Sequence, residues 1–280
     1  MDANLDALQA WTGRSETLDD TVAATPLRLM RALMDLPPDD TAAEVPPLWH
    51  WLYFLPGARQ SEIGDDGHPR RGGFLPPVPL PRRMWAGGQL EFFAPLRVGD
   101  AIRRTSTIDD VEVKTGRTGT LCFVRVRHEV SGPQGLALRE FHDIVYRDAP
   151  AAGAAVPQYA AAPEGEFTQT VVPDDVLLFR YSALTFNGHR IHYDRRYVTQ
   201  VEGYPGLIVH GPLMATLLAG LAMRKFAGRT AARFSFRALK PVFDLHPFDV
   251  CGKLDGADAC ELWIRDHAGD KAMAAHMEFR

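Results

Sequence analysis

Apolar and polar residues alternate with a period of two in four successive stretches of the first half of the chain. The alternation begins near Gly87 and continues through residues 101–114, 119–130 and 136–147. Glycine, aspartate and proline, which favour turns, separate these stretches. Because side chains of a strand point to alternate faces of a sheet, the pattern predicts an antiparallel meander with one buried face.

Two helical patterns precede these strands. A cap and a first-turn proline at Thr25-Pro26, followed by apolar residues at helical spacing, predict a short amphipathic helix. Residues 47–55 (PLWHWLYFL) are almost wholly apolar and predict a buried helix. Residues 56–83 contain many proline, glycine and arginine residues with little periodicity, and they predict a long ordered loop or lid.

The same order of elements returns in the second half. A strand is expected at 166–172, an irregular polar stretch near 185–205, and an apolar helix from Pro212 to about Phe226. Further strands are expected at 231–243, 248–255, 259–267 and 270–279. A repeated plan of a buried helix and a meander favours two copies of one fold over a single mixed domain.

The expected fold is therefore α+β, a double hot-dog in which two fused domains each wrap an antiparallel sheet around a central helix. The N-terminal hot-dog domain is assigned to residues 1–148 and the C-terminal one to residues 165–280. Residues 149–164, rich in alanine and proline, are expected to be the linker.

Composition narrows the class of protein. The chain has 280 residues, 46% of them hydrophobic, and a net charge of -4, so no strong positive field suggests a nucleic-acid partner. Three cysteines without CxxC spacing favour neither a disulfide framework nor a zinc knuckle. No apolar run approaches the ~18 residues that a membrane span needs. We expect a soluble cytoplasmic protein with no cofactor and no membrane partner.

Polar residues concentrate in one short segment of the second half. Asn187, His189, Arg190, His192 and Asp194 lie within eight residues, shortly before the apolar helix that begins at His210-Gly211-Pro212. Polar side chains this dense beside a buried helix need hydrogen-bond partners or a function. The segment is therefore the candidate active site.

The segment resembles the hydratase motif of the MaoC-like family of (R)-specific enoyl thioester hydratases. In that family an aspartate and a histidine five residues later hold the reacting water, and these places fall on Asn187 and His192. Three further segments resemble a subgroup with mesaconyl-C4-CoA hydratase, itaconyl-CoA hydratases and type 2 hydroxyacyl-thioester dehydratases. They are WTGRSE near residue 11, RGGFLPPVPLPRRMWAGG at 71–88 and SFRALKPVF at 235–243.

The resemblance implies roles for three residues. His192, with an ordinary pKa near ~6.5, is expected to take a proton from water as water adds to the β-carbon. Asn187 departs from the family's carboxylate and cannot act as a base, so its side-chain oxygen is expected to orient the water. The Gly211 N–H, at the start of the helix, is expected to stabilise the thioester oxygen.

The roles of the other polar residues of the segment are less well defined by the sequence. His189, Asp194 and Arg190 are possible supporting residues, and the sequence does not rank them. His189 and His192 have the spacing of half a metal site, but no third ligand is evident and Arg190 would repel a cation, so no metal is expected. For His210, a structural role at the start of the helix and a direct role in the site are equally expected.

The apolar helix and the basic residues after it give information about the type of reaction and the substrate. Residues 212–223 contain no carboxylate, whereas hot-dog thioesterases commonly carry one on this helix, as the resemblance implies. Most of the later basic residues are expected to be solvated. Arg233, Arg237 and Lys240 are candidates to bind the phosphates of coenzyme A, which we favour, or the acidic surface of an acyl carrier protein.

The leading hypothesis is reversible hydration of a short branched or dicarboxylic enoyl-CoA, such as mesaconyl-C4-CoA or itaconyl-CoA. Arg190 or an arginine of residues 70–83 is expected to hold the distal carboxylate. The alternatives are a 3-hydroxyacyl-carrier-protein dehydratase of fatty acid synthesis and a non-catalytic acyl-CoA-binding protein. The N-terminal half, with no equivalent polar cluster, is expected to be a degenerate copy that shapes the acyl tunnel. Pairing of two chains as a homodimer is left open.

Overall fold

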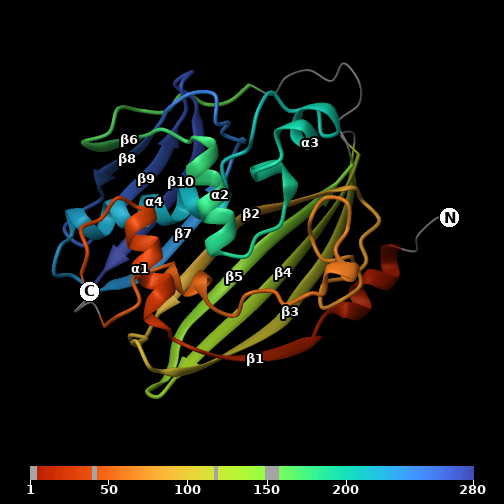
Figure 1. The fold of residues 1–280 in the computed structure, drawn as a ribbon, viewed down its shortest axis with the longest axis horizontal. Helices are drawn as coiled ribbons and strands as arrows, with labels where there is room; N and C mark the ends of the chain where they lie inside the picture. The colour runs from red at the N-terminus through yellow and green to blue at the C-terminus, as the bar shows by residue number, and fades with distance from the viewer. Residues whose placement is uncertain (1–4, 40–42, 117–118, 149–157) are drawn as a thin grey trace.

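The computed structural model describes residues 5–39, 43–116, 119–148 and 158–280. Ten strands form one antiparallel sheet in the order β1-β3-β4-β5-β2-β7-β10-β9-β8-β6 (Figure 1). The strands of the first half are β1 (Ser15–Thr21), β2 (Arg82–Phe92), β3 (Ala101–Gly116), β4 (Gly119–Gly132) and β5 (Gly135–Arg147). Those of the second half are β6 (Phe167–Val171), β7 (Ala231–Ala238), β8 (Phe248–Leu254), β9 (Ala259–Arg265) and β10 (Lys271–Phe279).

The two halves of the sheet have the same internal order. From the centre outwards, the first half runs β2, β5, β4, β3, β1 and the second runs β7, β10, β9, β8, β6. Strands β2 and β7 pair with each other across the centre, with Gly87 opposite Arg237 and Glu91 opposite Arg233. The chain therefore folds as two similar five-stranded units that share a continuous sheet.

The long apolar helix predicted near residues 212–226 is α4 (Gly211–Lys225), which packs against the strands of the second half. Pro212 occupies the first turn, where its missing N–H costs no helical hydrogen bond. The helix buries almost every side chain of its middle turns, because the sheet curves around it. It is the central helix of the second unit.

The described part of the first unit contains no comparable helix. Helix α1 (Ala24–Leu33) confirms the predicted amphipathic helix and buries Leu27, Met30 and Leu33. The cap expected at Thr25 is wrong, because the helix begins at Ala24 with no side-chain cap. The prediction of a buried helix at 47–55 is wrong, because the segment forms only a short 3-10 helix, η2 (Trp49–Leu52). Leu48 and Phe54 have φ angles of 70° and 55°, and residues in this left-handed region cannot continue a right-handed helix.

Several short elements escape prediction. Strand β1 is a largely exposed edge strand, whose polar residues hide the alternation. Helix α2 (Asp175–Leu184) begins at Asp174, whose side chain accepts a hydrogen bond from the Leu177 N–H. Helix α3 (Arg195–Gln200) and the 3-10 helix η4 (Arg190–His192) order the segment that was expected to be irregular. The last predicted strands start and end within a few residues of the observed ones, except that β7 stops at Ala238.

The expected loop at 56–83 lies on the concave face of the first half of the sheet, and its last two residues belong to β2 (Figure 1). Val78 and Leu80 anchor it in a small separate core with Ile108 and Val124. Most of the predicted linker, residues 149–157, lies outside the described residues. No helix in the described ranges is both long and apolar enough to cross a membrane.

Candidate active site

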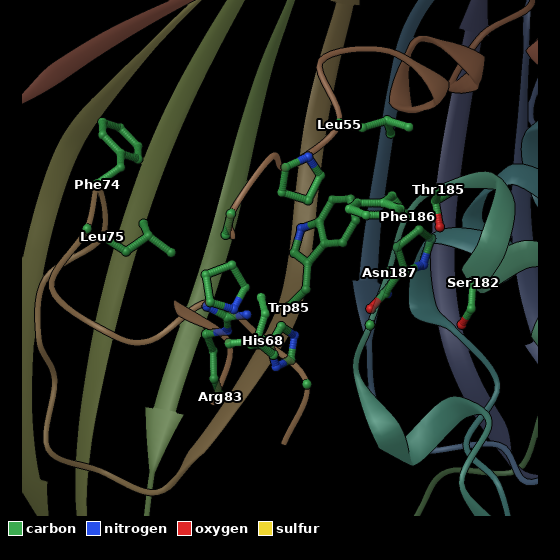
Figure 2. Close-up of a pocket in the computed structure, with 18 of the residues that line it drawn as sticks. Leu55, His68, Phe74, Leu75, Arg83, Trp85, Ser182, Thr185, Phe186 and Asn187 are labelled. Atoms are coloured by element: carbon green, nitrogen blue, oxygen red, sulfur yellow. The ribbon is translucent and has the colours of Figure 1, made fainter. Parts of the chain in front are cut away.

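A cavity of about 1090 Å³ lies between the two halves of the chain (Figure 2). The first half contributes the loop at 56–81 and the concave face of its strands, including Trp85 and His142. The second half contributes helix α2 and the turn that follows it, including Asn187. The cavity is therefore a composite site that neither half forms alone.

The turn after α2 positions Asn187 at the cavity wall. The backbone passes through Phe186 in the left-handed region, with φ of 49°, and the Asn187 N–H donates to the Ser182 carbonyl at 2.8 Å. The side-chain oxygen of Asn187 accepts a hydrogen bond from the His189 N–H at 3.0 Å. This oxygen therefore already has one partner within its own turn and keeps one lone pair for a further hydrogen bond.

His192 is buried, with 8% of its surface exposed. Its Nδ1 lies 2.6 Å from the Ile208 carbonyl oxygen, so Nδ1 carries the proton and Nε2 is left as an acceptor. Burial lowers the pKa of His192 to about 4, although the hydrogen bond to Ile208 acts in the opposite direction. The imidazole is therefore neutral near pH 7, as a base must be.

The start of α4 lies directly beside His192. The ring of His210, the residue before the helix, stacks on the His192 ring at 3.8 Å between centroids. His210 Nε2 hydrogen-bonds to Ser182 Oγ at 2.8 Å, and its pKa is lowered well below the usual value by burial. Ser182 thus links the helix start to Asn187, which bonds to its carbonyl.

The fold therefore brings together the three residues assigned to catalysis. Gly211 is the first residue of α4, and the first N–H groups of a helix have no acceptor within it. Pro212, the next residue, lines the cavity together with Asn187. His192 lies behind this wall, in contact with His210. Their roles in the reaction remain predictions.

Asp194 and Arg190 are engaged with each other. Asp194 accepts a hydrogen bond from the Tyr197 N–H and caps α3, while its other oxygen pairs with Arg190 at 2.8 Å. Arg190 also donates to the Asp65 carbonyl and lies over the Tyr197 ring. These contacts hold the turn in place, and Arg190, which lines the cavity, already has Asp194 as its carboxylate partner.

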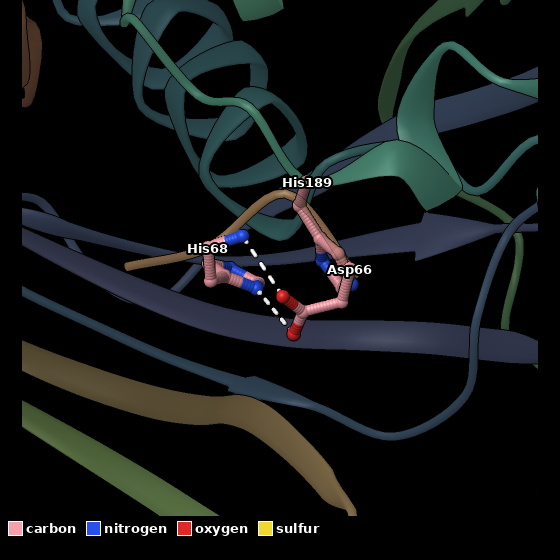
Figure 3. Close-up of side chains that lie close together, drawn as sticks. All are labelled: Asp66, His68 and His189. Atoms are coloured by element: carbon pink, nitrogen blue, oxygen red, sulfur yellow. Dashed lines mark hydrogen bonds and ion pairs between the residues drawn. The ribbon is translucent and has the colours of Figure 1, made fainter. Parts of the chain in front are cut away.

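A group that the sequence did not indicate comes from the loop of the first half. Asp66 and His68 lie against His189, and ligand-type atoms of all three lie within 4.8 Å of one another (Figure 3). The sequence showed no third ligand for the pair His189 and His192; the structure places two ligand-type residues beside His189, in a group that does not include His192. More than a hundred residues separate the loop from the motif, so no local pattern indicated the contact.

The first half also contains a buried polar network, contrary to expectation. Glu140 is almost fully buried and accepts hydrogen bonds from His50, Trp51 and His142. Burial alone raises the pKa of Glu140, but the hydrogen bonds and charges of His142 and His50 outweigh it and lower the pKa well below the usual value. The sequence did not indicate this network, because its members come from separate elements. The first-half wall of the cavity is therefore charged.

The residues proposed to bind coenzyme A lie elsewhere. Arg233 pairs with Glu278, and Lys240 pairs with Asp266 and Asp270. Arg233 and Arg237 alternate along β7 with the buried Phe234 and Phe236, so they face the outer side of the sheet. None of the three lines the cavity. Their binding of coenzyme A stays a prediction without support from their position.

Comparison with protein families gives a match over most of the chain. The model of the family "Hydroxyacyl-thioester dehydratase type 2" matches residues 48–244. Mesaconyl-C(4)-CoA hydratase of Chloroflexus aurantiacus is 46% identical over 273 residues, which cover 96% of each chain. The mitochondrial hydroxyacyl-thioester dehydratase type 2 of Schizosaccharomyces pombe is 26% identical, over 81% of this chain and 82% of its own.

Solved structures agree in fold. A MaoC-like dehydratase from Phytophthora capsici superimposes with a TM-score of 0.70 at 14% identity, over 99% of both chains. HtdX of Mycobacterium tuberculosis gives 0.67 at 16% identity, over 95% of this chain and all of its own. Another M. tuberculosis protein, reported to have a double hotdog fold, gives 0.59 at 13% identity, over 98% and 97%. The predicted double hot-dog fold is confirmed.

Proposed function

The chain belongs to the hydroxyacyl-thioester dehydratase type 2 family, and from this premise we propose that it hydrates a short dicarboxylic enoyl-CoA of the mesaconyl-C4 kind. It is a hydro-lyase that adds water to, or removes water from, an acyl-CoA thioester. The observation that carries the choice of substrate is the identity of 46% to a mesaconyl-C(4)-CoA hydratase, over 96% of both chains. The charged first-half wall of the cavity supports a short polar acyl group over a long fatty one.

We assign the proton transfer to His192. Its free Nε2 takes a proton from water while the oxygen forms a bond to the β-carbon, and the electrons of the double bond move towards the thioester oxygen. The Gly211 N–H donates to that oxygen, with the positive end of the α4 dipole behind it. His192 then returns this proton to the α-carbon, which completes the addition of one water and regenerates the neutral imidazole, and dehydration runs the same steps backwards.

Arg83 is the residue that we assign to the free carboxylate. In a mesaconyl-C4 thioester this carboxylate is attached to the β-carbon, so its cationic partner has to lie beside the water that attacks that carbon. Arg83 lines the cavity next to His68 and Trp85, interacts with the Tyr146 side chain, and pairs with no carboxylate among the described residues (Figure 2). A guanidinium there can bind a carboxylate through two parallel N–H groups.

Two other arginines of residues 70–83 are already engaged by the protein. Arg71 donates to the carbonyls of Val78, Leu80 and Pro81 and so holds the loop in shape. Arg82 donates to the Tyr204 hydroxyl and the Glu202 carbonyl. We propose that residues 1–148 shape the acyl site. Residues 165–280 complete it with the catalytic turn, the segment from Asn187 to Asp194.

The test is a panel of thioesters incubated with the purified protein. Mesaconyl-C4-CoA, itaconyl-CoA and crotonyl-CoA are compared by the loss or gain of conjugated thioester absorbance and by product mass. We expect the highest kcat/KM with mesaconyl-C4-CoA. The same acyl group on a carrier protein tests the alternative handle, and a higher rate there would point to a carrier-protein dehydratase. Tight binding without any turnover would identify a non-catalytic acyl-CoA-binding protein.

A further inference from the structure

The loop of the first half is fixed onto the catalytic turn by its main chain. The Arg190 N–H donates to the Asp66 carbonyl at 2.9 Å, and the Gly64 N–H donates to the His68 carbonyl at 2.8 Å. Gly67 lies so close to Gly188 that a Cβ on Gly67 would be 1.8 Å from the Gly188 carbonyl oxygen. The loop tip therefore has one defined position relative to the turn.

Asp66 orients His68 within this tip. One oxygen of Asp66 lies 3.1 Å from His68 Nδ1, and the other accepts a hydrogen bond from the His68 main-chain N–H at 2.9 Å. The carboxylate thus holds the proton on Nδ1 and leaves Nε2 of His68 as an acceptor. His68 lines the cavity together with Asn187, and 23% of its side chain is exposed (Figure 2).

His68 also extends the row of histidines in the site. Its ring lies 4.0 Å from the His189 ring, which lies 5.4 Å from the His192 ring. Burial lowers the pKa of His68, although the hydrogen bond that His68 donates to Asp66 acts in the opposite direction, and burial lowers the pKa of His189 to about 2. These imidazoles are therefore neutral at pH 7. His68 is the one of the three that lines the cavity.

A water molecule has two hydrogens, and two acceptors fix the direction of its attacking lone pair. His192 Nε2 offers one acceptor, and the Asn187 oxygen, which already accepts a hydrogen bond from the His189 N–H, has one lone pair left. We propose that His68, oriented by Asp66, is a second catalytic imidazole that accepts a hydrogen bond from the reacting water. This inference rests on the proposed hydration reaction, and it makes the first half a contributor to the chemistry.

The experiment compares H68Q and D66N with the parent and with H267Q, which alters an exposed histidine stacked on His246. The parent is first assayed on the thioester panel, and the variants then on the substrate with the highest rate. We expect kcat to fall about 10²-fold in H68Q and about 10-fold in D66N, with KM and melting temperature near the parent's. H267Q is expected to match the parent.

The pH profile separates contact with water from a role in packing. Asp66 raises the pKa of His68, whereas Arg83 and Arg71 lower it. D66N is therefore expected to move the acid limb of kcat/KM to lower pH, an effect that a merely structural role would not produce. If H68Q loses stability, H68N at a temperature well below its melting point provides the same comparison.

The outcomes are distinguishable. A parent that turns over no thioester rejects the proposed function and this inference together. A parent that is active, with H68Q within twofold of its kcat, rejects the role of His68 alone. Activity that chelators abolish and a divalent cation restores would also overturn it, because Asp66, His68 and His189 would then be metal ligands.

Discussion

Gly67 and Gly188 meet main chain to main chain, at the point where the first-half loop docks onto the turn that follows α2. Gly67 has a φ of 88°, and a Cβ there would lie 1.8 Å from the Gly188 carbonyl oxygen. Gly67→Ala is therefore expected to displace the loop tip, lowering kcat at least 10-fold and stability by about 2 kcal/mol. Enzyme assays and urea denaturation measure the two effects.

Gly57→Ala is the matched control for this prediction. Gly57 belongs to the same loop, has no positive φ, and has open space where a Cβ would stand. We expect its activity to match the parent's and its stability to change by less than about 0.5 kcal/mol. Equal activity of both variants would show that the contact between Gly67 and Gly188 does not position the site.

The docking of this loop also marks the limit of what the sequence could predict. The period-two strands, helix α4 and the polar motif around His192 were predicted because each is a local pattern, with one buried face or with densely spaced polar residues. His50 and Glu140 are 90 residues apart, and the contact between them appears only after strands and loop are assembled. The predicted buried helix at 47–55 failed because two residues with positive φ override an apolar pattern.

Arg83→Met is expected to change the choice of substrate. Loss of one charge-assisted contact to the free carboxylate should cost about 1.5–3 kcal/mol, a ~10- to 150-fold lower kcat/KM with mesaconyl-C4-CoA. Crotonyl-CoA has no second carboxylate and serves as the internal control, for which we expect a change below threefold. A parallel loss with both thioesters would argue that Arg83 supports the fold or coenzyme A instead.

Glu140→Ala is expected to destabilise the protein strongly. It removes the shared acceptor of His50, Trp51 and His142 and leaves their buried donors without a partner, at a cost of about 3–5 kcal/mol. The control is Glu129→Ala, whose half-exposed carboxylate pairs with Arg127 and Arg139 and should contribute less than about 1 kcal/mol. Urea titrations give both values, and similar costs for the two variants would contradict the expectation.

His192→Ala is expected to lower kcat by ~10² or more while KM changes little, because the base acts mainly in the transition state. His246→Gln, at an exposed position, controls for the general effect of losing an imidazole. Initial rates over a range of thioester concentrations separate kcat from KM. A rate equal to the parent's would reject His192 as the base.

The buried, neutral state of His192 predicts how stability depends on pH. Its pKa is about 4 in the folded protein and ~6.5 when unfolded, so the unfolded chain binds the proton more readily. The contribution of neutral His192 to the free energy of unfolding is fully present above pH ~6.5. It is lost as the pH falls towards 4, where the loss reaches about 3 kcal/mol. His192→Gln has no such proton to bind, so its free energy of unfolding should fall less steeply than the parent's between these pH values. His267→Gln, at an exposed position, should keep the parent's slope, and a slope unchanged in both variants would show that His192 titrates normally.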